Sequence, residues 1–231
     1  MSGSAGRPMG TIAVAISTGI VLLGLAVAVF FNPWFVAFEQ GRANATTWTG
    51  YTPEQLRSAT DSILGDLYLG GSFGVTINGT PVLDARERQH MQDVRAVFAA
   101  FWVLVGVGAI VLGLGLRRSR GAAWFWRAVA WGSTVVGIGV IFLGAIAFVA
   151  FDALFEAFHR LFFAGGSYTF DPRTERLVQL FPDAFWFETS ILLGGVLLVL
   201  SVAVRVFAVR RTGGGRLRTG GRAAVPVEGT R

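Results

Sequence analysis

Four long apolar runs, separated by polar stretches of unequal length, dominate the pattern of the chain. They cover residues 11–31, 94–116, 128–151 and 189–209. A helix needs about 20 residues to cross the hydrocarbon core of a bilayer, so each run is long enough for one transmembrane helix. Arg205 lies near the end of the last run, where a long side chain can reach the interface. We predict a single four-span transmembrane domain over residues 11–209.

The polar stretch between the first and second runs carries its own folding signals. Residues 52–55 (TPEQ) combine a hydroxyl N-cap, a proline at the first helical position and a glutamine three residues after the cap. Alternating apolar residues then lead into Asn78-Gly79, a pair typical of a tight β-hairpin. Asp84 and Glu87 form a second capping pattern, from which we expect a helix to continue into the second run. The predicted fold is an all-α membrane protein with a small extracytoplasmic helix-plus-β-hairpin cap.

The composition of the chain predicts a membrane protein, and the distribution of its charges predicts which side of the membrane the termini face. Of its 231 residues, 53% are hydrophobic and 15% charged, and the mean hydropathy of +0.57 is too high for a soluble domain. All 20 basic residues are arginines, concentrated between the second and third runs and after the fourth. The connections over residues 32–93 and 152–188 each carry more acidic than basic residues. Because basic residues favour the cytoplasmic side, we expect a multi-pass protein of the cell membrane with both termini cytoplasmic.

The two ends of the chain and the missing residue types narrow the possible functions. Residues 1–10 and the Gly- and Arg-rich residues 210–231 are predicted to be disordered cytoplasmic segments. The arginines flank membrane spans and have no motif context typical of nucleic-acid binding. The chain has no cysteine, which excludes disulfides, thiol nucleophiles and thiolate metal sites.

The chain has only two histidines, and both fall on the predicted outer side near the membrane interface. Each follows a glutamate by three residues: Glu87 precedes His90, and Glu156 precedes His159. Around His159, phenylalanine and leucine recur on one face of a predicted helix that ends at residues 164–166. Three polar residues share the other face of that helix: Asp152, Glu156 and His159. The shared Glu-x-x-His pattern makes the two histidines the main candidates for chemistry.

Three interpretations fit this pattern. In the first, each glutamate is a favourable helix neighbour of its histidine, and both histidines merely line an interfacial surface. In the second, the carboxylates fix the tautomers of the imidazoles, which then move protons during acyl or phosphoryl transfer. In the third, the two Glu-x-x-His pairs combine with Glu39 and Glu188 in a dinuclear metal site of the carboxylate-bundle type. The position of these acids near helix ends, and not in a bundle core, disfavours the third.

Several short segments stand at fixed places around the four predicted spans. NP (32–33) follows the first span, RERQHMQDV (86–94) enters the second, and the segment from FD (151–152) to HRLFF (159–163) follows the third. FDP (170–172) and LFP (180–182) precede the fourth span. With these segments the chain resembles the bacterial lipoprotein intramolecular transacylase family, called Lit, over about residues 11–209, most specifically around the two histidines.

The resemblance implies a membrane acyltransferase of bacteria that acts at the outer leaflet. Such an enzyme moves the sn-2 acyl chain of a diacylglyceryl-modified lipoprotein to the amine of its N-terminal cysteine. By this resemblance His90 and His159 transfer protons, and Glu87 and Glu156 orient them. Three residues near the histidines are candidate substrate-binding residues: Asp93, Asp152 and Tyr168.

The same resemblance defines the expected partners. They are membrane lipid and the N-terminus of a diacylated bacterial lipoprotein, and we predict neither a cofactor, a resident metal ion nor a nucleic-acid partner. The alternative is a non-catalytic membrane protein whose outer cap binds a lipid or a partner protein. A close approach of the two histidines would favour the enzyme, because joint proton transfer needs hydrogen-bond reach or one bridging water.

Overall fold

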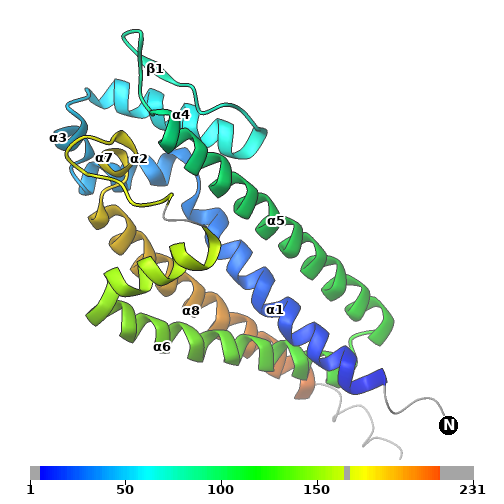
Figure 1. Ribbon diagram of the computed structural model, residues 1–231. Coiled ribbons are helices and arrows are strands. Elements are labelled where there is room, and N and C mark those ends of the chain that lie inside the picture. The colour runs from blue at the N-terminus through cyan, green and yellow to red at the C-terminus, as the bar shows by residue number, and fades with distance from the viewer. Residues whose placement is uncertain (1–5, 164–166, 214–231) are drawn as a thin grey trace, which may run out of the picture.

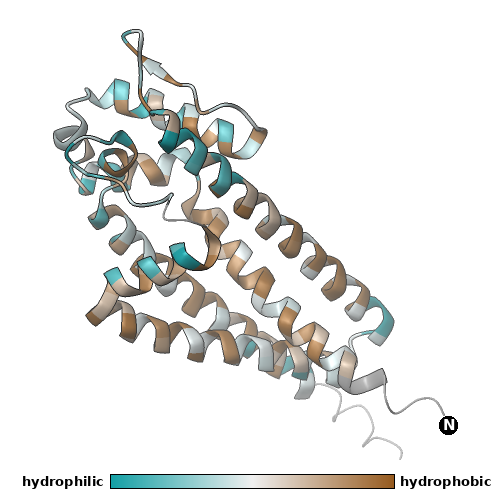
Figure 2. Cartoon of the chain, in the orientation of Figure 1, coloured by the Kyte–Doolittle hydropathy of each residue, from teal (hydrophilic) through white to brown (hydrophobic). Residues whose placement is uncertain are grey.

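The four apolar runs form four long helices, which confirms the predicted all-helical membrane fold (Figure 1). The computed structural model describes residues 6–163 and 167–213. Its long helices are α1 (Gly6–Phe30), α5 (Ala85–Ser119), α6 (Ala123–Phe162) and α8 (Asp183–Gly213). Each is long and apolar enough to span a membrane. Apolar residues dominate these helices, and polar residues gather toward the cap end of the molecule (Figure 2).

Helices α1 and α8 extend beyond the apolar runs. α1 begins at Gly6 and α8 continues to Gly213, so residues 6–10 and 210–213 of the segments predicted to be disordered are helical. Two arginines lie in the last turn of α8, where positive charge is favourable near the C-terminal end of the helix dipole. The rest of both segments, and the helix end predicted at residues 164–166, lie outside the described residues.

α1 lies in the middle of the bundle, with α5 on one side and α6 and α8 on the other (Figure 1). The approach of α6 to α1 depends on glycine, because a Cβ built on Gly132 would lie 2.3 Å from the carbonyl oxygen of Ala15. On the other side, a Cβ built on Gly24 would lie 2.6 Å from a methyl group of Val105 in α5. α5 and α6 make few contacts with each other. The separation between α5 and α6 is therefore set mainly by α1.

A cap of short elements covers the end of the bundle where α5 begins (Figure 1). It contains α2 (Pro33–Arg42), α3 (Ala45–Thr49), α4 (Pro53–Leu69), β1 (Thr76–Ile77), β2 (Thr80–Pro81) and α7 (Arg176–Leu180). The predicted capping box of Thr52 and Gln55 opens α4, and the two strands form the predicted antiparallel hairpin. Asn78 and Gly79 have φ angles of 51° and 78°, the positive values that a tight hairpin turn requires. The predicted helix-plus-hairpin cap is confirmed.

The cap has its own hydrophobic core and a buried polar connection. The core includes Leu56, Ile63, Leu67, Phe73, Val82 and Leu180. The side chain of Gln40 is fully buried. It donates to the carbonyl oxygen of Leu180 and accepts from the Thr60 hydroxyl, both at 3.0 Å. Because a buried amide without partners is costly, these hydrogen bonds hold α2, α4 and α7 in one arrangement.

The first turns of α5 and the last turns of α6 position the candidate site. α5 begins with the predicted capping box: Asp84 accepts from the backbone N–H of Glu87 at 2.8 Å, and Glu87 accepts from that of Asp84 at 2.7 Å. α5 then runs without interruption into the apolar run, as predicted. α6 is kinked at Ala150, which has φ −148° and ψ 46°. After the kink, its final segment leaves the direction of the bundle and bends back toward α1 (Figure 1).

Candidate functional site

The two histidines lie side by side at the end of the bundle that carries the cap. The ring centroids of His90 and His159 are 6.2 Å apart, and their planes differ by 24°. His90 is buried with 6% of its surface exposed, whereas His159 is half-buried. At this separation both imidazoles can act on one small group, directly or through one water molecule. The kink at Ala150 allows this approach, because it redirects the helix that carries His159.

His159 is held by the backbone of its own helix. Its Nδ1 lies 2.8 Å from the carbonyl oxygen of Phe155, which can only accept a hydrogen bond. Nδ1 therefore carries the proton in the neutral ring, and Nε2 has a free lone pair. The rings of Phe155 and Tyr168 lie 4.1 Å and 5.0 Å from the imidazole, measured between centroids. His159 is thus fixed in a tautomer that can accept a proton at Nε2.

His90 is enclosed by aromatic rings. Phe163 and Phe170 present their rings at 62° and 67° to the imidazole, with centroids 4.9 Å and 5.4 Å away. Its Nδ1 is buried and has no hydrogen-bond partner in the described part of the chain. Such an enclosure favours the uncharged imidazole, because a charged ring would lose its hydration.

Burial sets the protonation of both histidines. Residues 85–93 precede the apolar run of α5, and His159 follows that of α6, so both rings lie outside the membrane-spanning stretches. Burial, and then repulsion from His159, lowers the pKa of His90 to about 4, and Asp93 opposes this shift. Burial also lowers the pKa of His159, against the hydrogen bond to Phe155. Both imidazoles are therefore neutral near pH 7.

The two glutamates do not orient the histidines in the way that their spacing predicts. Glu87 is fully buried and accepts from the backbone N–H groups of Asp84 and Leu177, at 2.7 Å and 2.6 Å. Glu156 is exposed and pairs with Arg160 at 2.6 Å. The first glutamate thus connects α5 to α7, and the second forms an ion pair one turn along its own helix. Each glutamate does lie one helical turn before its histidine. Its carboxylate, however, binds other groups: the backbone of Asp84 and Leu177 for Glu87, and Arg160 for Glu156.

The three candidate substrate-binding residues differ in their positions. The ring of Tyr168 lies 5.0 Å from the imidazole of His159, measured between centroids, and is tilted by 37° to it. Asp93 is half-buried one turn after His90 and accepts from the Gln89 side chain at 3.2 Å. Asp152 is exposed two turns before His159. Tyr168 is therefore the candidate that the structure places against a histidine, and Asp93 influences His90 through its charge.

The loop that contains Tyr168 and the FDP motif covers the histidine pair, through contacts of Phe170 and Arg86 that the sequence analysis did not predict. We call residues 167–175 the aromatic loop. Its Phe170 lies between His90 and Arg86, whose guanidinium carbon is 4.9 Å from the ring centroid. Arg86 also forms an ion pair with Glu175 at the end of the same loop. Arg86 precedes His90 by four residues, one helical turn, and this spacing was the available sign that Arg86 lies near the site.

The ligands of the hypothetical dinuclear metal site are not assembled. Glu39 of α2 is fully buried beside Arg42, and Arg42 pairs with Glu188 of α8 at 2.6 Å. Burial, and then the neighbouring Glu188, raises the pKa of Glu39, whereas Arg42 opposes the shift. Across residues 6–163 and 167–213, no three His, Asp or Glu side chains are grouped to hold a metal ion. These two acids instead form a contact between α2 and α8.

Comparison with known proteins identifies relatives of this arrangement. Residues 11–186 match the family described as lipoprotein intramolecular transacylase Lit. An uncharacterized protein of Aquifex aeolicus (strain VF5) is 25% identical over 179 residues, which cover 74% of this chain and 80% of that protein.

Solved structures of a lipoprotein intramolecular transacylase show the same fold. The membrane-integral Lit of Bacillus cereus aligns with a TM-score of 0.76 at 19% identity, covering 91% of this chain and 98% of that one. A variant of that protein, with one histidine replaced by arginine, aligns with a TM-score of 0.74 and covers 92% and 94% of the two chains. The structural likeness shows the fold, and the family match covers well over half of the sequence. This chain therefore belongs to the Lit family of membrane transacylases.

Proposed function

We propose that this protein moves the sn-2 acyl chain of a diacylglyceryl-modified lipoprotein to the α-amino group of its N-terminal cysteine. An amide C–N bond forms, and the ester bond between the acyl carbon and the sn-2 oxygen breaks. The proton lost by the amine ends on the freed glyceryl hydroxyl, so neither water nor a second substrate is consumed. The observation that carries the proposal is the pairing of His90 and His159 in a chain of the Lit family.

The environments of the two histidines support different roles. His159 is the proposed base, because its Nδ1–H is held by the Phe155 carbonyl and its Nε2 is free to accept a proton from the amine. His90 is the weaker base, since its pKa is near 4. It is the proposed hydrogen-bond donor to the ester carbonyl, where negative charge develops. His159 then passes the proton to the departing glyceryl oxygen.

The proposed chemistry asks little of the protein beyond position and proton transfer. Amine and ester belong to one substrate molecule, so their reaction is intramolecular once the chain is held in a reactive conformation. The neutral state of both histidines suits this task, because one must accept a proton and the other must donate a hydrogen bond without carrying charge. Glu87 and Glu156 are proposed to support the site structurally, and not to orient the rings.

Arginine placement supports a site at the outer leaflet. His90 lies near the start of α5 and His159 in the last turn of α6, so both lie at the helix ends opposite the α5–α6 turn. The cap lies at the same end of the bundle (Figure 1). Arg117 and Arg118 occupy the last turn of α5, next to that turn, and Arg210 and Arg211 occupy the last turn of α8. If this arginine-rich end is cytoplasmic, the cap and the histidines face outward. We propose that both termini are cytoplasmic and that the ester is bound from the outer leaflet.

The test is expression in bacterial cells whose lipoproteins are diacylated, followed by mass spectrometry of lipoprotein N-terminal peptides. We expect peptides with one acyl chain on the cysteine nitrogen and one on the glyceryl group. Unchanged diacylglyceryl peptides in cells that contain the folded protein would refute the function.

Two variants test the residue roles in the same cells. His159→Gln is expected to abolish the product, because glutamine cannot accept the amine proton. Glu156→Gln is the matched control on the same helix, and we expect it to retain activity, since it loses only an exposed pair with Arg160. Full activity of His159→Gln would rule out its role as the base, and loss of activity in Glu156→Gln at normal protein level would restore an orienting role for Glu156.

A further inference from the structure

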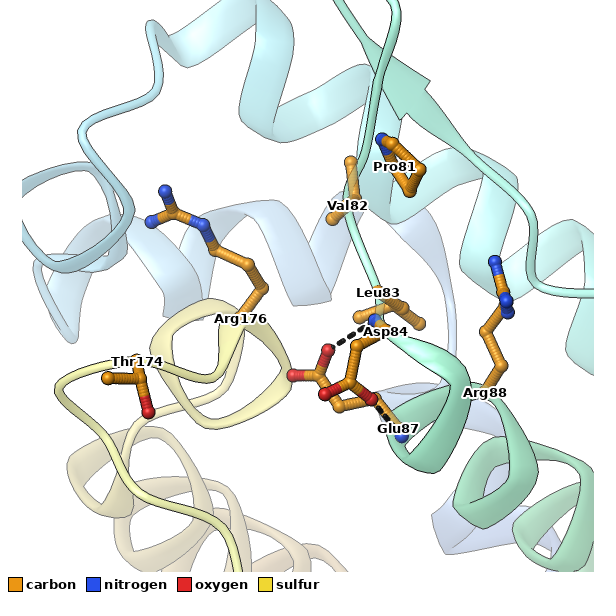
Figure 3. Close-up of a pocket in the computed structure, with 8 residues that line it drawn as sticks. All are labelled: Pro81, Val82, Leu83, Asp84, Glu87, Arg88, Thr174 and Arg176. Atoms are coloured by element: carbon orange, nitrogen blue, oxygen red, sulfur yellow. Dashed lines mark hydrogen bonds between the residues drawn. The ribbon is translucent and has the colours of Figure 1, made fainter.

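A pocket of about 410 Å³, lined by both charged and apolar residues, opens on the cap near the start of α5. It lies where the end of β2, the first turn of α5 and the segment before α7 meet (Figure 3). Its lining consists of Pro81, Val82, Leu83, Asp84, Glu87, Arg88, Thr174 and Arg176. Figure 3 shows Arg88 and Arg176 on opposite sides, with the carboxylates of Asp84 and Glu87 between them. None of the steps proposed for acyl transfer uses this pocket.

The acidic groups of the pocket already have partners. Asp84 and Glu87 accept from each other's backbone N–H groups, and Glu87 also accepts from Leu177 at 2.6 Å. These hydrogen bonds place both carboxylates against the positive end of the α5 dipole, which reduces their effective charge. The carboxylates therefore serve the fold and are poor candidates for binding a cationic ligand.

Neither of the two arginines, in contrast, forms an ion pair within residues 6–163 and 167–213. Arg176 donates to the Thr49 carbonyl and the Gln179 side chain, at 2.9 Å and 2.6 Å, and both acceptors are neutral. Arg88 is half-buried and forms no ion pair with any described residue. The Arg176 guanidinium also lies over the Tyr51 ring, 5.3 Å from its centroid, so Arg176 is already engaged by neutral groups. The guanidinium of Arg88 favours a ligand that supplies carbonyl oxygens or carboxylates. A peptide chain, neutral or acidic, has this chemistry.

The position of the pocket relative to the histidines fixes which part of a substrate could reach it. Asp84 precedes His90 by six residues on α5, which corresponds to about 9 Å along the helix axis. An extended peptide covers about 3.3–3.6 Å per residue, so this distance equals roughly three residues. In the other direction, α5 continues into its apolar run, where acyl chains belong. A chain that enters the pocket is thus the part of the substrate that leaves the membrane.

We propose that the pocket binds the polypeptide that follows the lipidated cysteine, at about the second to fourth residues, and that Arg88 favours acidic over basic side chains there. This inference rests on the proposed acyl transfer and adds a peptide subsite to it. The lipid would be held by the membrane-facing part of the site, the reacting amine and ester by the histidines, and the peptide by the pocket.

The test compares three lipopeptides that share one diacylglyceryl-cysteine. The first is the cysteine amide alone, the second continues with Ser-Asp-Asp-Ser, and the third with Ser-Lys-Lys-Ser. Both binding and turnover are measured with full-length protein in lipid nanodiscs. We expect the acidic lipopeptide to bind more tightly than the cysteine amide, and Arg88→Ala to weaken its binding about fivefold while leaving the cysteine amide unchanged. Arg57→Ala, an exposed α4 arginine paired only with Asp61, is the matched control.

A second variant fills the pocket without removing an internal side-chain contact. Thr174 is exposed on the pocket rim, and Thr174→Trp is expected to weaken both tetrapeptide-extended lipopeptides and to spare the cysteine amide. Equal affinity of the wild type for all three lipopeptides, or equal weakening of all three by Arg88→Ala, would overturn the subsite. If the subsite fails in this way but the cysteine amide is still turned over, the proposed acyl transfer stands. If the acidic lipopeptide binds selectively but no lipopeptide is turned over, the subsite stands and the acyl transfer is refuted.

Discussion

Replacing Gly132 with alanine tests how closely α6, the helix that carries His159, packs on α1. A Cβ at this position would lie 2.3 Å from the carbonyl oxygen of Ala15 and 3.0 Å from the Cβ of Thr18. The first neighbour is backbone, so no side-chain rotation can relieve the contact. The two helices must therefore move apart by about 0.7 Å before the approach returns to the 3.0 Å below which Cβ contacts are essentially never seen.

Two opposing terms decide the size of the effect. Alanine is better than glycine in a helix by about 0.5–1 kcal/mol. Overpacking typically costs about 1–3 kcal/mol, and a gap of this size also forfeits a quarter or more of the dispersion attraction between the atoms that it separates. Since the clash is with backbone, the cost belongs toward the upper end of that range. We expect Gly132→Ala to lower the free energy of unfolding by about 1–2 kcal/mol.

The assay is thermal unfolding in one detergent, followed by tryptophan fluorescence. Gly139→Ala is the matched control, because it lies two turns further along α6 and has no atom within 4 Å of a built Cβ. We expect this control to melt at or slightly above the wild-type temperature and Gly132→Ala to melt several degrees below it. Equal or higher stability of Gly132→Ala would refute the inference that the α1–α6 contact leaves no room for a methyl group.

Three further predictions concern the site. Because burial lowers the pKa of His90 to about 4, its ring should stay neutral well below pH 6.5; we expect the His90 ring signals of nitrogen-15 histidine-labelled protein, assigned by comparison with His90→Gln, to titrate near pH 4, and a midpoint near 6.5 would contradict this. Glu87→Gln weakens two buried backbone hydrogen bonds and should lower unfolding stability by about 1–3 kcal/mol, whereas loss of turnover at unchanged stability would instead make Glu87 a catalytic group. Glu175→Gln breaks the ion pair between Arg86 and the aromatic loop, and the loosened loop should let diethylpyrocarbonate modify His90 faster. Arg173→Gln, which removes an ion pair within the same loop, should leave the rate unchanged. Equal rates for the two variants would show that the Arg86–Glu175 pair does not hold the loop over His90.

Local signals in the sequence were sufficient for most of the fold. The apolar runs predicted the four spans, and the capping patterns at Thr52 and Asp84 and the Asn78-Gly79 turn predicted the cap, because each depends on residues a few positions apart. The kink at Ala150 was not predicted, since no proline or other local signal marks it. Its geometry accompanies distant aromatic contacts, such as Phe151 on Phe187.

The candidate site also combines features that the sequence predicts with features that it does not. The order of spans was enough to predict that both histidines lie on one side of the membrane. Their distance from each other depends on how α5 and α6 pack on α1, which the sequence does not reveal. The Glu-x-x-His spacing predicted that each glutamate binds its histidine, and the structure shows other partners. Glu87 accepts a hydrogen bond from Leu177, a residue far along the chain, and Glu156 forms an ion pair with Arg160. A local pattern can nominate a pair, but long-range competition decides whether the pair forms.

The hydrogen bond from Leu177 to Glu87 also has a consequence for biogenesis. The two residues are 90 positions apart. At about 5–20 residues per second, ribosomes need roughly 5–20 s to add the chain between them. During this interval the first turn of α5 has already been made, yet only one of the two backbone donors for its buried carboxylate, that of Asp84, exists. A nascent chain that ended before residue 170 would lack the second donor to Glu87 and also the Phe170 ring that covers His90.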